Sequence, residues 1–292
     1  MTAKAAVVGW PIQHSLSPVL HGHWLKQYDI DGTYEKIAIE PGTFAQRIAE
    51  LRAAGYRGVN VTVPFKEEAF AIAEEPKMAA KIASAANLLA FGTDGRIHAD
   101  NTDGFGLQHS LRQELGNSWG GKRVVLLGAG GAARGGVLAL NALRVTEIHI
   151  LNRNSERAEI LASNLSTALR AVQEPHHIPT PMITGGGMGN WEVAARGAAL
   201  VVNTTSAGMK GSAPLDLDLT ALPKSAAVCD IVYNPLETDL LKRAKERGHV
   251  TVDGLGMLMH QAAPSFKVFF GQFPEVTPQL RTALIEALQV RG

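Results

Sequence analysis

The sequence predicts a soluble α/β protein of two domains, and three observations lead to this prediction. Short apolar runs typical of buried strands alternate with helical patterns along most of the chain, as they do in α/β folds. A run of turn-forming residues at 116–121 interrupts this alternation, which starts again at Lys122. The length of 292 residues is about twice that of a typical domain. The run at 116–121 is therefore the first candidate for a domain boundary.

The first half is expected to form an α/β domain that contains a hairpin. Ser17 and Pro18 open its first helix, because a serine can accept hydrogen bonds from free N–H groups and proline is tolerated in the first turn. The pair Asp94-Gly95 suits the tight turn between hairpin strands 87–91 and 96–99. The other expected strands are 5–8, 33–39 and 58–63, and the helices are 17–28, 43–54, 67–73, 78–83 and 104–115.

The second half is expected to form another α/β domain, with strands of the buried type. These strands are 122–127, 147–151, 199–203, 227–231 and 249–252, and the helices between them end at about 143 or span 155–165 and 238–247. Prolines and tandem glycines interrupt segment 171–190, which we predict to be an irregular, mobile surface insertion. Segment 256–289 is predicted to form mostly two helices, which could pack on either domain.

Composition and charge exclude several classes of function. The 28 Lys and Arg residues nearly balance the 27 Asp and Glu residues, so no excess of positive charge is left for nucleic acid or anionic lipid. No apolar run reaches the roughly 18 residues that a membrane helix needs. The single cysteine, Cys229, excludes an internal disulfide, and the N-terminal segment lacks the pattern of a secretion signal. We therefore expect a cytoplasmic protein in which Cys229 is a buried apolar side chain.

A glycine-rich loop between a strand and a helix predicts a dinucleotide site. The pattern Gly-x-Gly-x-x-Ala runs from Gly128 to Ala133, where Gly128 allows a tight turn, Gly130 lets the backbone approach a pyrophosphate and Ala133 permits close helix packing. The free N–H groups at the start of the helix favour the anion. The residues expected to contact the cofactor here are Gly128, Ala129, Gly130, Gly131 and Ala132. A tight turn that binds nothing is the alternative.

The next strand end favours NADP over NAD. An NAD site has an acidic residue there for the ribose 2′-hydroxyl, whereas this chain has Asn152-Arg153-Asn154, with Arg157 one turn further on. Guanidinium and amide groups bind a 2′-phosphate by charge-assisted hydrogen bonds. Glu156 lies nearby and weakens this interpretation, and the arginines could instead only solvate the surface.

Polar residues cluster near strand ends in the first half, where open α/β sheets bind ligands. The segments are 14–18, 60–66, 86–87 and 101–104. Each alone is as typical of a cap or turn as of a site. Together they offer hydroxyls for a carboxylate, amides for alcohols, and Lys66 with Asp103 for proton transfer. This set suits a small polyhydroxylated acid.

The order of these motifs resembles the shikimate dehydrogenase family over nearly the whole chain. The motifs that carry the resemblance are Gly9-x-Pro11-Ile12-x-His14-Ser15-x-Ser17-Pro18, Asn60-Val61-Thr62-x-Pro64-x-Lys66, Asp100-Asn101-Thr102-Asp103-Gly104, the loop 128–134, Asn152-Arg153, Asn203-x-Thr205-Ser206-x-Gly208-Met209, Asp230-x-x-Tyr233-x-Pro235-x-x-Thr238 and Gly254-Leu255-Gly256-Met257-Leu258-x-x-Gln261. The resemblance implies reversible reduction of 3-dehydroshikimate to shikimate by NADPH in aromatic amino acid biosynthesis, the chorismate pathway.

The resemblance also implies the domain organisation. An N-terminal α/β substrate-binding and catalytic domain, 1–105 plus 262–292, and a Rossmann-type NADP-binding domain, 106–261, would flank a cleft. The C-terminal helices would return to the first domain. The protein would be a monomer or a homodimer.

The resemblance further implies the role of each residue. Lys66 is the general acid and base paired with Asp103, because an ammonium both stabilises and protonates the alkoxide that hydride transfer leaves. Oxidation needs the neutral amine, so its rate should rise with pH. The substrate would contact Ser15, Ser17, Asn60, Thr62, Asn87, Tyr233 and Gln261. The cofactor would contact the loop 128–132, Asn152, Arg153, Asn154, Arg157, Thr205, Ser206, Met209, Ile231, Gly254 and Met257.

The chain departs from the family pattern at one substrate-binding motif, and two rival functions stay open beside the leading one. Ser84-Ala85-Ala86-Asn87-Leu88 stands where the family usually has Gly-Ala-x-Asn-Thr, so one hydroxyl is missing. The rivals are a quinate or quinate/shikimate dehydrogenase that uses NAD, and a non-catalytic sensor of shikimate and nucleotide. We expect no metal, since His21 and His23 face different ways on a helix. Asp230 is expected to be structural, at a strand end.

Overall fold

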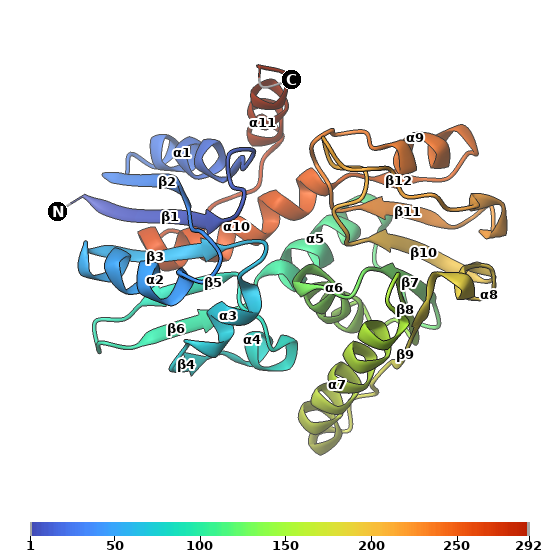
Figure 1. The fold of residues 1–292 in the computed structure, drawn as a ribbon. Helices are drawn as coiled ribbons and strands as arrows, with labels where there is room; N and C mark the ends of the chain where they lie inside the picture. Colours follow the sequence, from blue (N-terminus) through green and yellow to red (C-terminus); the bar gives the residue numbers. More distant parts are fainter. Residues whose placement is uncertain (1, 291–292) are drawn as a thin grey trace. The chain divides into compact units, whose positions relative to one another are not determined.

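The computed structural model describes residues 2–290 and contains two compact units (Figure 1). Unit 1 runs to Gly106 and resumes at Leu258, and unit 2 is Leu107–Met257. The sequence-based boundaries were 105/106 and 261/262, and the loop at 116–121 does not divide the units. Helices α5 (Asp103–Leu115) and α10 (Gly254–Phe270) run through the two boundaries without a break, so no turn signal marks either of them.

Unit 1 is built on a mixed six-stranded sheet in the order β2-β1-β3-β5-β6-β4. Strands β1, β2 and β3 are parallel, β5 is antiparallel to both β3 and β6, and β4 is parallel to β6. The predicted hairpin is therefore confirmed as β5–β6. The strands are β1 (Ala3–Gly9), β2 (Gly32–Ala38), β3 (Tyr56–Val61), β4 (Glu75–Pro76), β5 (Leu88–Phe91) and β6 (Ile97–Asp100).

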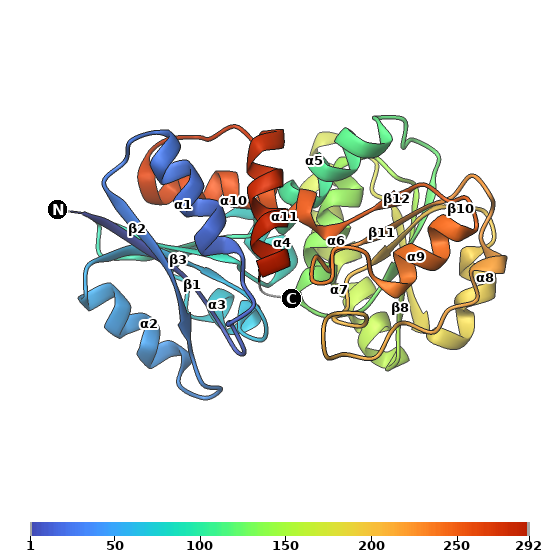
Figure 2. The ribbon, with the colours of Figure 1, turned by 90° about the horizontal axis from the view of Figure 1, so that it is seen from above.

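Helices cover both faces of this sheet. Figures 1 and 2 show α1 (Ser17–Gln27) and the later turns of α10 on one face, and α2 (Phe44–Ala53) and α3 (Lys66–Ala71) on the other. Helix α4 (Met78–Ala83) contacts β6, and α11 (Pro278–Val290) contacts α1. The C-terminal helical segment thus belongs to unit 1 from Leu258 onward. The face beneath α2 is filled by apolar side chains such as Val8, Ile48 and Phe65.

The start of α1 corrects one expectation about capping. Leu16 is the N-cap residue and makes no side-chain capping bond, while Ser17 is the first helical residue and Pro18 follows it. The Ser15 hydroxyl accepts from the Ser17 N–H at 3.3 Å, so Ser15 takes the role expected of Ser17. This leaves the buried Ser17 hydroxyl for other partners.

The other face of the sheet carries an aromatic cluster around a buried histidine. The His21 ring stacks on Tyr34, with ring centroids 3.8 Å apart and planes 2° from parallel. Trp24, Phe266 and Phe270 lie around the same ring at centroid distances of 5.8–6.4 Å. Neither ring nitrogen of His21 has a hydrogen-bond partner within residues 2–290. Burial lowers the pKa of His21 to about 3, so the ring is neutral in the folded protein.

We expect His21 to make the protein less stable in mild acid. Its pKa falls from 6.5 to about 3 on folding, so between these pH values the unfolded chain binds a proton that the folded chain does not. This contribution is fully present above pH 6.5 and declines by roughly 1 kcal/mol per pH unit below it. Urea unfolding at pH 6.5 and 5 should show this loss in the wild type and not in His21→Leu. His23→Leu, a variant on the same helix, should lose as much stability as the wild type. If the free energy of unfolding falls equally between pH 6.5 and 5 in all three proteins, His21 is not the cause.

Unit 2 is a parallel six-stranded sheet in the order β12-β11-β10-β7-β8-β9. Numbered from the first strand of the unit, this is the order 3-2-1-4-5-6 of doubly wound dinucleotide-binding folds, read from the opposite edge. The predicted α/β fold with a Rossmann-type second domain is therefore confirmed. The strands are β7 (Arg123–Leu127), β8 (Glu147–Asn152), β9 (Met182–Gly187), β10 (Ala198–Asn203), β11 (Ala227–Asp230) and β12 (Thr251–Val252).

Alternate residues of the central strands face helices on opposite sides of this sheet. Val125 and Leu127 belong to a core cluster with Trp191 and Leu241, from α8 (Trp191–Ala195) and α9 (Asp239–Glu246). Leu126 points the other way, toward α6 (Gly131–Ala142), where a Cβ on Gly136 would lie 2.9 Å from it. The buried thiol of Cys229 lies in β11, and burial raises its pKa. None of the helices within residues 2–290 is long and apolar enough to span a membrane.

Segment 171–190 is not an irregular insertion. Helix α7 (Ser155–Gln173) continues well past the predicted end at 165, and β9 pairs with β8 in parallel register from Glu147–Met182 to Asn152–Gly187. Short 3-10 helices, Glu174–His176 and Met188–Asn190, flank β9. A Cβ on Gly185 would collide with the backbone of Ala158 in α7. The tandem glycines that suggested a loop thus allow close packing of a strand against a helix.

Candidate active site

The topology of unit 1 brings the polar segments to one edge of its sheet. Strands β1 and β3 are parallel, and β6 has the same direction because two antiparallel pairings separate it from β3. The carboxyl ends of β1, β3 and β6 therefore share an edge, and the antiparallel strand β5 begins there. The segments at this edge are 10–17, 62–66, 84–87 and 101–103.

Lys66 and Asp103 form a largely buried ion pair at this edge. The Lys66 ammonium donates to Oδ2 of Asp103, and the two side chains are only 13% and 6% exposed. Lys66 is the first residue of α3 and Asp103 the first of α5. The start of a helix stabilises a carboxylate there. The Asp103 N–H donates to Oδ1 of Asn101 at 3.2 Å, which fixes the start of α5.

Asn87 connects this ion pair to two further side chains. Its Nδ2 lies 2.8 Å from Oδ1 of Asp103, 2.9 Å from Oγ1 of Thr102 and 3.2 Å from Oε1 of Gln261. Its Oδ1 accepts from the Thr102 N–H at 2.8 Å, so the orientation of the amide is fixed. Lys66, Asn87, Asp103 and Gln261, which the sequence placed in one site, thus form one hydrogen-bonded group together with Thr102.

Asn60 has little hydrogen-bonding capacity left for a substrate. Its Nδ2 donates to the backbone oxygen of Asn87 at 3.1 Å and to Oγ of Ser265 at 2.8 Å. Its Oδ1 accepts from the Tyr34 hydroxyl at 2.8 Å. The sequence assigned Asn60 to a ring hydroxyl, but both of its N–H hydrogens bind protein groups. Asn60 therefore supports Asn87 through its backbone oxygen, and the bond to a ring hydroxyl stays a prediction, because Oδ1 can accept a second hydrogen bond.

The two predicted carboxylate-binding serines differ in exposure. Ser15 is half-buried in the loop before α1, whereas Ser17 is buried. Thr62 follows β3 and is half-buried, with its N–H bonded to Val8. A Cβ on Gly9 would lie 2.5 Å from Cγ2 of Thr62, which explains the glycine at that position.

The loop after β7 has the geometry of a phosphate-binding turn. Gly128 has a φ of +108°, and a Cβ there would lie 2.9 Å from both Thr204 and Thr205. A Cβ on Gly130 would meet no atom within 4 Å, so the space over its backbone is open. Gly130 is the N-cap of α6 and no side chain caps the helix, which leaves the first N–H groups to an anion. Gly131 and Ala132 begin that helix, and Ala129 is buried. The residues present fit a dinucleotide diphosphate.

The loop after β8 presents two arginines to solvent. Arg153 and Arg157 are both exposed, and no carboxylate within residues 2–290 pairs with either guanidinium. Asn154 caps α7, because its Oδ1 accepts from the Arg157 N–H at 3.0 Å. Nδ2 of Asn152 donates to the Asn154 backbone oxygen at 3.0 Å. The two amides therefore shape the loop, and the two arginines supply its charge.

Buried polar side chains shape the loops after β10 and β11. The Thr205 hydroxyl donates to Oδ1 of Asn203 at 2.7 Å, and Nδ2 of Asn203 donates to Asp230 at 3.0 Å. Asp230 also accepts from the Val232 N–H and from the hydroxyl of Thr238, which caps α9. Burial raises the pKa of Asp230, although these hydrogen bonds oppose the change. Asp230 is thus structural, as predicted.

The structure brings Ile231 and Gly254 into contact. A Cβ on Gly254 would collide with the Ile231 backbone, so only glycine allows this approach. Met257 is buried three residues further along α10, and Tyr233 is half-buried in the loop after β11. Met209 lines a cavity of about 390 Å³ with Gly208, Asn234 and Pro235. Ser206 is exposed in the same loop as Met209.

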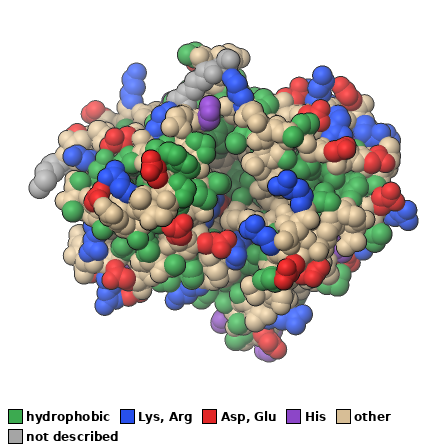
Figure 3. Space-filling model, in the orientation of Figure 1, with side chains coloured by type: hydrophobic (Ala, Val, Ile, Leu, Met, Phe, Trp, Pro, Cys, Tyr) green, Lys and Arg blue, Asp and Glu red, His purple; other side chains and the backbone are tan. Residues whose placement is uncertain are grey.

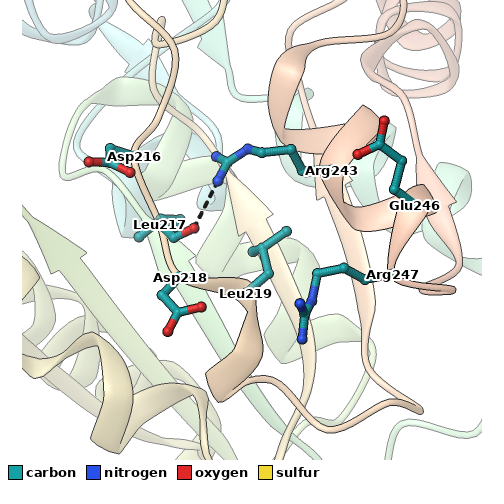
Figure 4. Close-up of a pocket in the computed structure, with 7 residues that line it drawn as sticks. All are labelled: Asp216, Leu217, Asp218, Leu219, Arg243, Glu246 and Arg247. Carbon is teal, nitrogen blue, oxygen red and sulfur yellow. Dashed lines mark hydrogen bonds between the residues drawn. The ribbon is translucent and has the colours of Figure 1, made fainter.

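Another cavity in unit 2, of about 370 Å³, is lined by other residues (Figure 4). Asp216, Asp218 and Glu246 line it together with Arg243 and Arg247, so its charges are mixed. Arg243 donates to the backbone oxygen of Leu217 at 2.9 Å and thereby holds this segment against α9. Within residues 2–290 no three His, Cys, Asp or Glu side chains are grouped to hold a metal ion. Acidic and basic side chains are interspersed on the face shown in Figure 3.

Comparison with known proteins shows the family to which this chain belongs. Residues 7–89 match the model of the shikimate dehydrogenase substrate binding domain, and residues 110–178 match that of shikimate / quinate 5-dehydrogenase. The chain is 44% identical over 290 residues to the shikimate dehydrogenase (NADP(+)) of Methylobacterium radiotolerans, with 98% of each chain covered. The chain belongs to the shikimate dehydrogenase family. The resemblance predicted from the motifs is thus confirmed.

Two solved structures from this family illustrate its range. Shikimate 5-dehydrogenase from Thermus thermophilus, in complex with NADP(H) and shikimate, superposes with a TM-score of 0.81 at 30% identity and 99% coverage of each chain. Quinate dehydrogenase from Corynebacterium glutamicum, in complex with NAD, gives a TM-score of 0.86 at 26% identity, covering 98% of this chain and 99% of its own. Members of the shikimate dehydrogenase family with different substrates and cofactors therefore share this fold.

Sequence reasoning overlooked three side chains that support this shikimate dehydrogenase site. Thr102 bonds to Asn87 and Gln261, while Tyr34 and Ser265 bond to Asn60. Thr102 lies inside a motif that was recognised, so its position could have indicated a role. Tyr34 and Ser265 lie in a strand and a helix with no motif around them.

Proposed function

We propose that the protein is an NADP-dependent shikimate dehydrogenase, which reversibly reduces 3-dehydroshikimate to shikimate. The observation that carries this proposal is the largely buried Lys66–Asp103 pair, hydrogen-bonded to Asn87 at the ligand-binding edge of unit 1. Two oppositely charged groups with small exposed fractions can move a proton without competition from bulk water. A protein that only senses shikimate has no use for such a pair.

Lys66 supplies the proton chemistry. During reduction, the Nζ–H of Lys66 donates to the oxygen on which negative charge develops and then transfers the proton. During oxidation, neutral Nζ accepts the hydroxyl proton. Asp103 holds the ammonium in place and balances its charge, while Asn87 fixes the carboxylate of Asp103 through Oδ1 at 2.8 Å.

Substrate hydroxyls and the carboxylate are bound by the remaining polar groups of unit 1. Gln261 and Thr62 are half-buried at the site edge and offer an amide and a hydroxyl to ring hydroxyls. Ser15 and Ser17 offer two hydroxyls near the start of α1, which suits a carboxylate. Tyr233 of unit 2 is also proposed to bind the substrate carboxylate.

The cofactor is bound by unit 2. The backbone at Gly130 and the first turn of α6 hold the diphosphate, and Arg153 and Arg157 hold the 2′-phosphate. When bound, NADPH supplies the hydride for the carbonyl carbon. Thr205, Ser206, Met209, Ile231, Gly254 and Met257 line the path toward the nicotinamide. Residence in the cytoplasm and a monomeric or homodimeric state belong to the same proposal, the former supported by the unpaired Cys229.

The test is the initial rate of NADPH formation at alkaline pH with shikimate and NADP. We expect rapid turnover with this pair and slow turnover when NAD replaces NADP or quinate replaces shikimate. A preference for NAD or quinate would contradict the roles given to Arg153 and Arg157 or to the hydroxyl-binding residues. No turnover with any pair would overturn the enzymatic proposal in favour of a sensor.

A further inference from the structure

We propose that Tyr34 is a positioning residue of the active site, whose hydroxyl holds the supporting amide of Asn60 in register. This inference rests on the proposed function. Tyr34 lies in β2, two strands away from Asn60 in β3 across the central strand β1. The Tyr34 hydroxyl nevertheless lies 2.8 Å from Oδ1 of Asn60.

The hydrogen bond of the Tyr34 hydroxyl fixes a supporting amide of the site. The hydroxyl donates to Oδ1 of Asn60 at 2.8 Å. A phenol has one hydrogen to donate, and Asn60 takes it. Burial holds the pKa of Tyr34 well above its ordinary value, so the hydroxyl stays a donor across the pH range of an assay.

The bond to Asn60 fixes which way that amide points. With Oδ1 held by Tyr34, the Nδ2 hydrogens of Asn60 face the Asn87 backbone oxygen at 3.1 Å and Oγ of Ser265 at 2.8 Å. The side chain of the same Asn87 holds Oδ1 of Asp103 at 2.8 Å. A chain of hydrogen-bonded groups therefore leads from Tyr34 to the carboxylate beside Lys66. Each of the links lies within a buried set of side chains, where an unmade bond is costly.

The ring of Tyr34 is itself held in place. His21 stacks on it in parallel at 3.8 Å, and Phe269 lies at a centroid distance of 6.3 Å. Tyr34 is 8% exposed and His21 is fully buried. Replacing tyrosine by phenylalanine therefore removes the hydroxyl while the ring keeps its neighbours, so the variant isolates the hydrogen bonds.

Tyr34→Phe should raise KM for shikimate about tenfold while KM for NADP stays at the wild-type value. The matched control is Tyr28→Phe, because the Tyr28 hydroxyl also lies in unit 1 and accepts a hydrogen bond, at 3.1 Å from the N–H of Glu275, which is not one of the predicted site residues. Tyr28→Phe should keep both KM values. Thermal unfolding of both variants measures any loss of stability separately. A wild-type KM for shikimate in Tyr34→Phe, or an equal rise in Tyr28→Phe, would overturn the inference.

A second variant tests whether Tyr34 acts through Asn60. Ser265→Ala removes another partner of the same amide, so the effects of Tyr34→Phe and Ser265→Ala on kcat/KM for shikimate should not multiply in the double variant. Multiplying effects would show that the two residues act independently and would overturn the proposed path.

A direct measurement separates this inference from the proposed function. The side-chain amide of Asn60 gives a pair of signals in a nitrogen-15 spectrum, identified by their loss in Asn60→Ala. We expect both hydrogens to exchange slowly in the wild type and faster in Tyr34→Phe, and to be unaffected in Tyr28→Phe. This result does not depend on turnover, so absence of activity with shikimate would refute the proposed function alone. Unchanged exchange in Tyr34→Phe would refute the inference alone.

Discussion

Lys66→Ala is expected to lower kcat for shikimate oxidation by at least about a hundredfold, with little change in shikimate binding. The variant lacks the only charged donor bonded to Asp103 among the described residues, so no group transfers the proton and none stabilises the developing oxyanion. Asn87 and Thr102 still shape the pocket, because their hydrogen bonds do not involve Lys66. Initial rates at saturating shikimate and NADP, together with calorimetric binding of shikimate, measure both quantities.

Two further variants make this result specific. Lys77→Ala removes another unit 1 lysine that pairs with an aspartate, since Nζ of Lys77 lies 3.4 Å from Asp100, but its side chain is 62% exposed. It should retain wild-type kcat. Lys66→Arg keeps the positive charge beside Asp103 but cannot release a proton at any assay pH, so it should be as slow as Lys66→Ala if proton transfer dominates. Near-normal turnover in Lys66→Ala would remove Lys66 from the chemistry.

The fold was largely predictable because its local signals agree with each other. The strand-loop-helix pattern at Gly128 and the alternation of strands and helices predict an open α/β sheet, and the order in unit 2 confirms it. The errors share one cause. Glycines at 185–187 were interpreted as a loop, although Gly185 serves close packing against α7, and the unit boundary inside α5 has no sequence signal. Tertiary contacts, which a single sequence does not display, decide both.

The candidate site was predictable only where its residues lie in motifs. Lys66, Asn87 and Asp103 were grouped by their place at strand ends and Gln261 by resemblance, and the structure joins them through hydrogen bonds. Their roles stay predictions. Asn60 was predicted to bind the substrate because it lies in a motif. A motif shows that an amide is needed at a position, but it does not show what the amide binds. Tyr34 could not be predicted as a site residue, because it lies in no motif. Its hydroxyl bonds to Asn60 across the strand between them, a contact that only the fold creates.

The second large effect is expected on KM for NADP, when the two arginines after β8 are removed. Arg153→Ala combined with Arg157→Ala should raise KM for NADP at least about a hundredfold and leave KM for NAD within about twofold, because a charge-assisted hydrogen bond to a phosphate contributes roughly 1.5–3 kcal/mol and NAD has no 2′-phosphate. Both side chains are exposed, so removing them leaves no buried group without a partner. Steady-state kinetics with each cofactor at saturating shikimate measure the change.

The matched control for the double variant is Arg170→Ala, because Arg170 is an exposed arginine in the last turn of the same helix, α7. It changes the net charge of unit 2 without touching the loop after β8, so it should leave both KM values unchanged. The single variants should each show a smaller part of the NADP effect, since Arg153 precedes the helix and Arg157 lies in its first turn. An unchanged KM for NADP in the double variant would mean that the two guanidinium groups only solvate the surface. Cofactor preference would then have to come from the backbone and the amides of Asn152 and Asn154, which are already hydrogen-bonded within the loop.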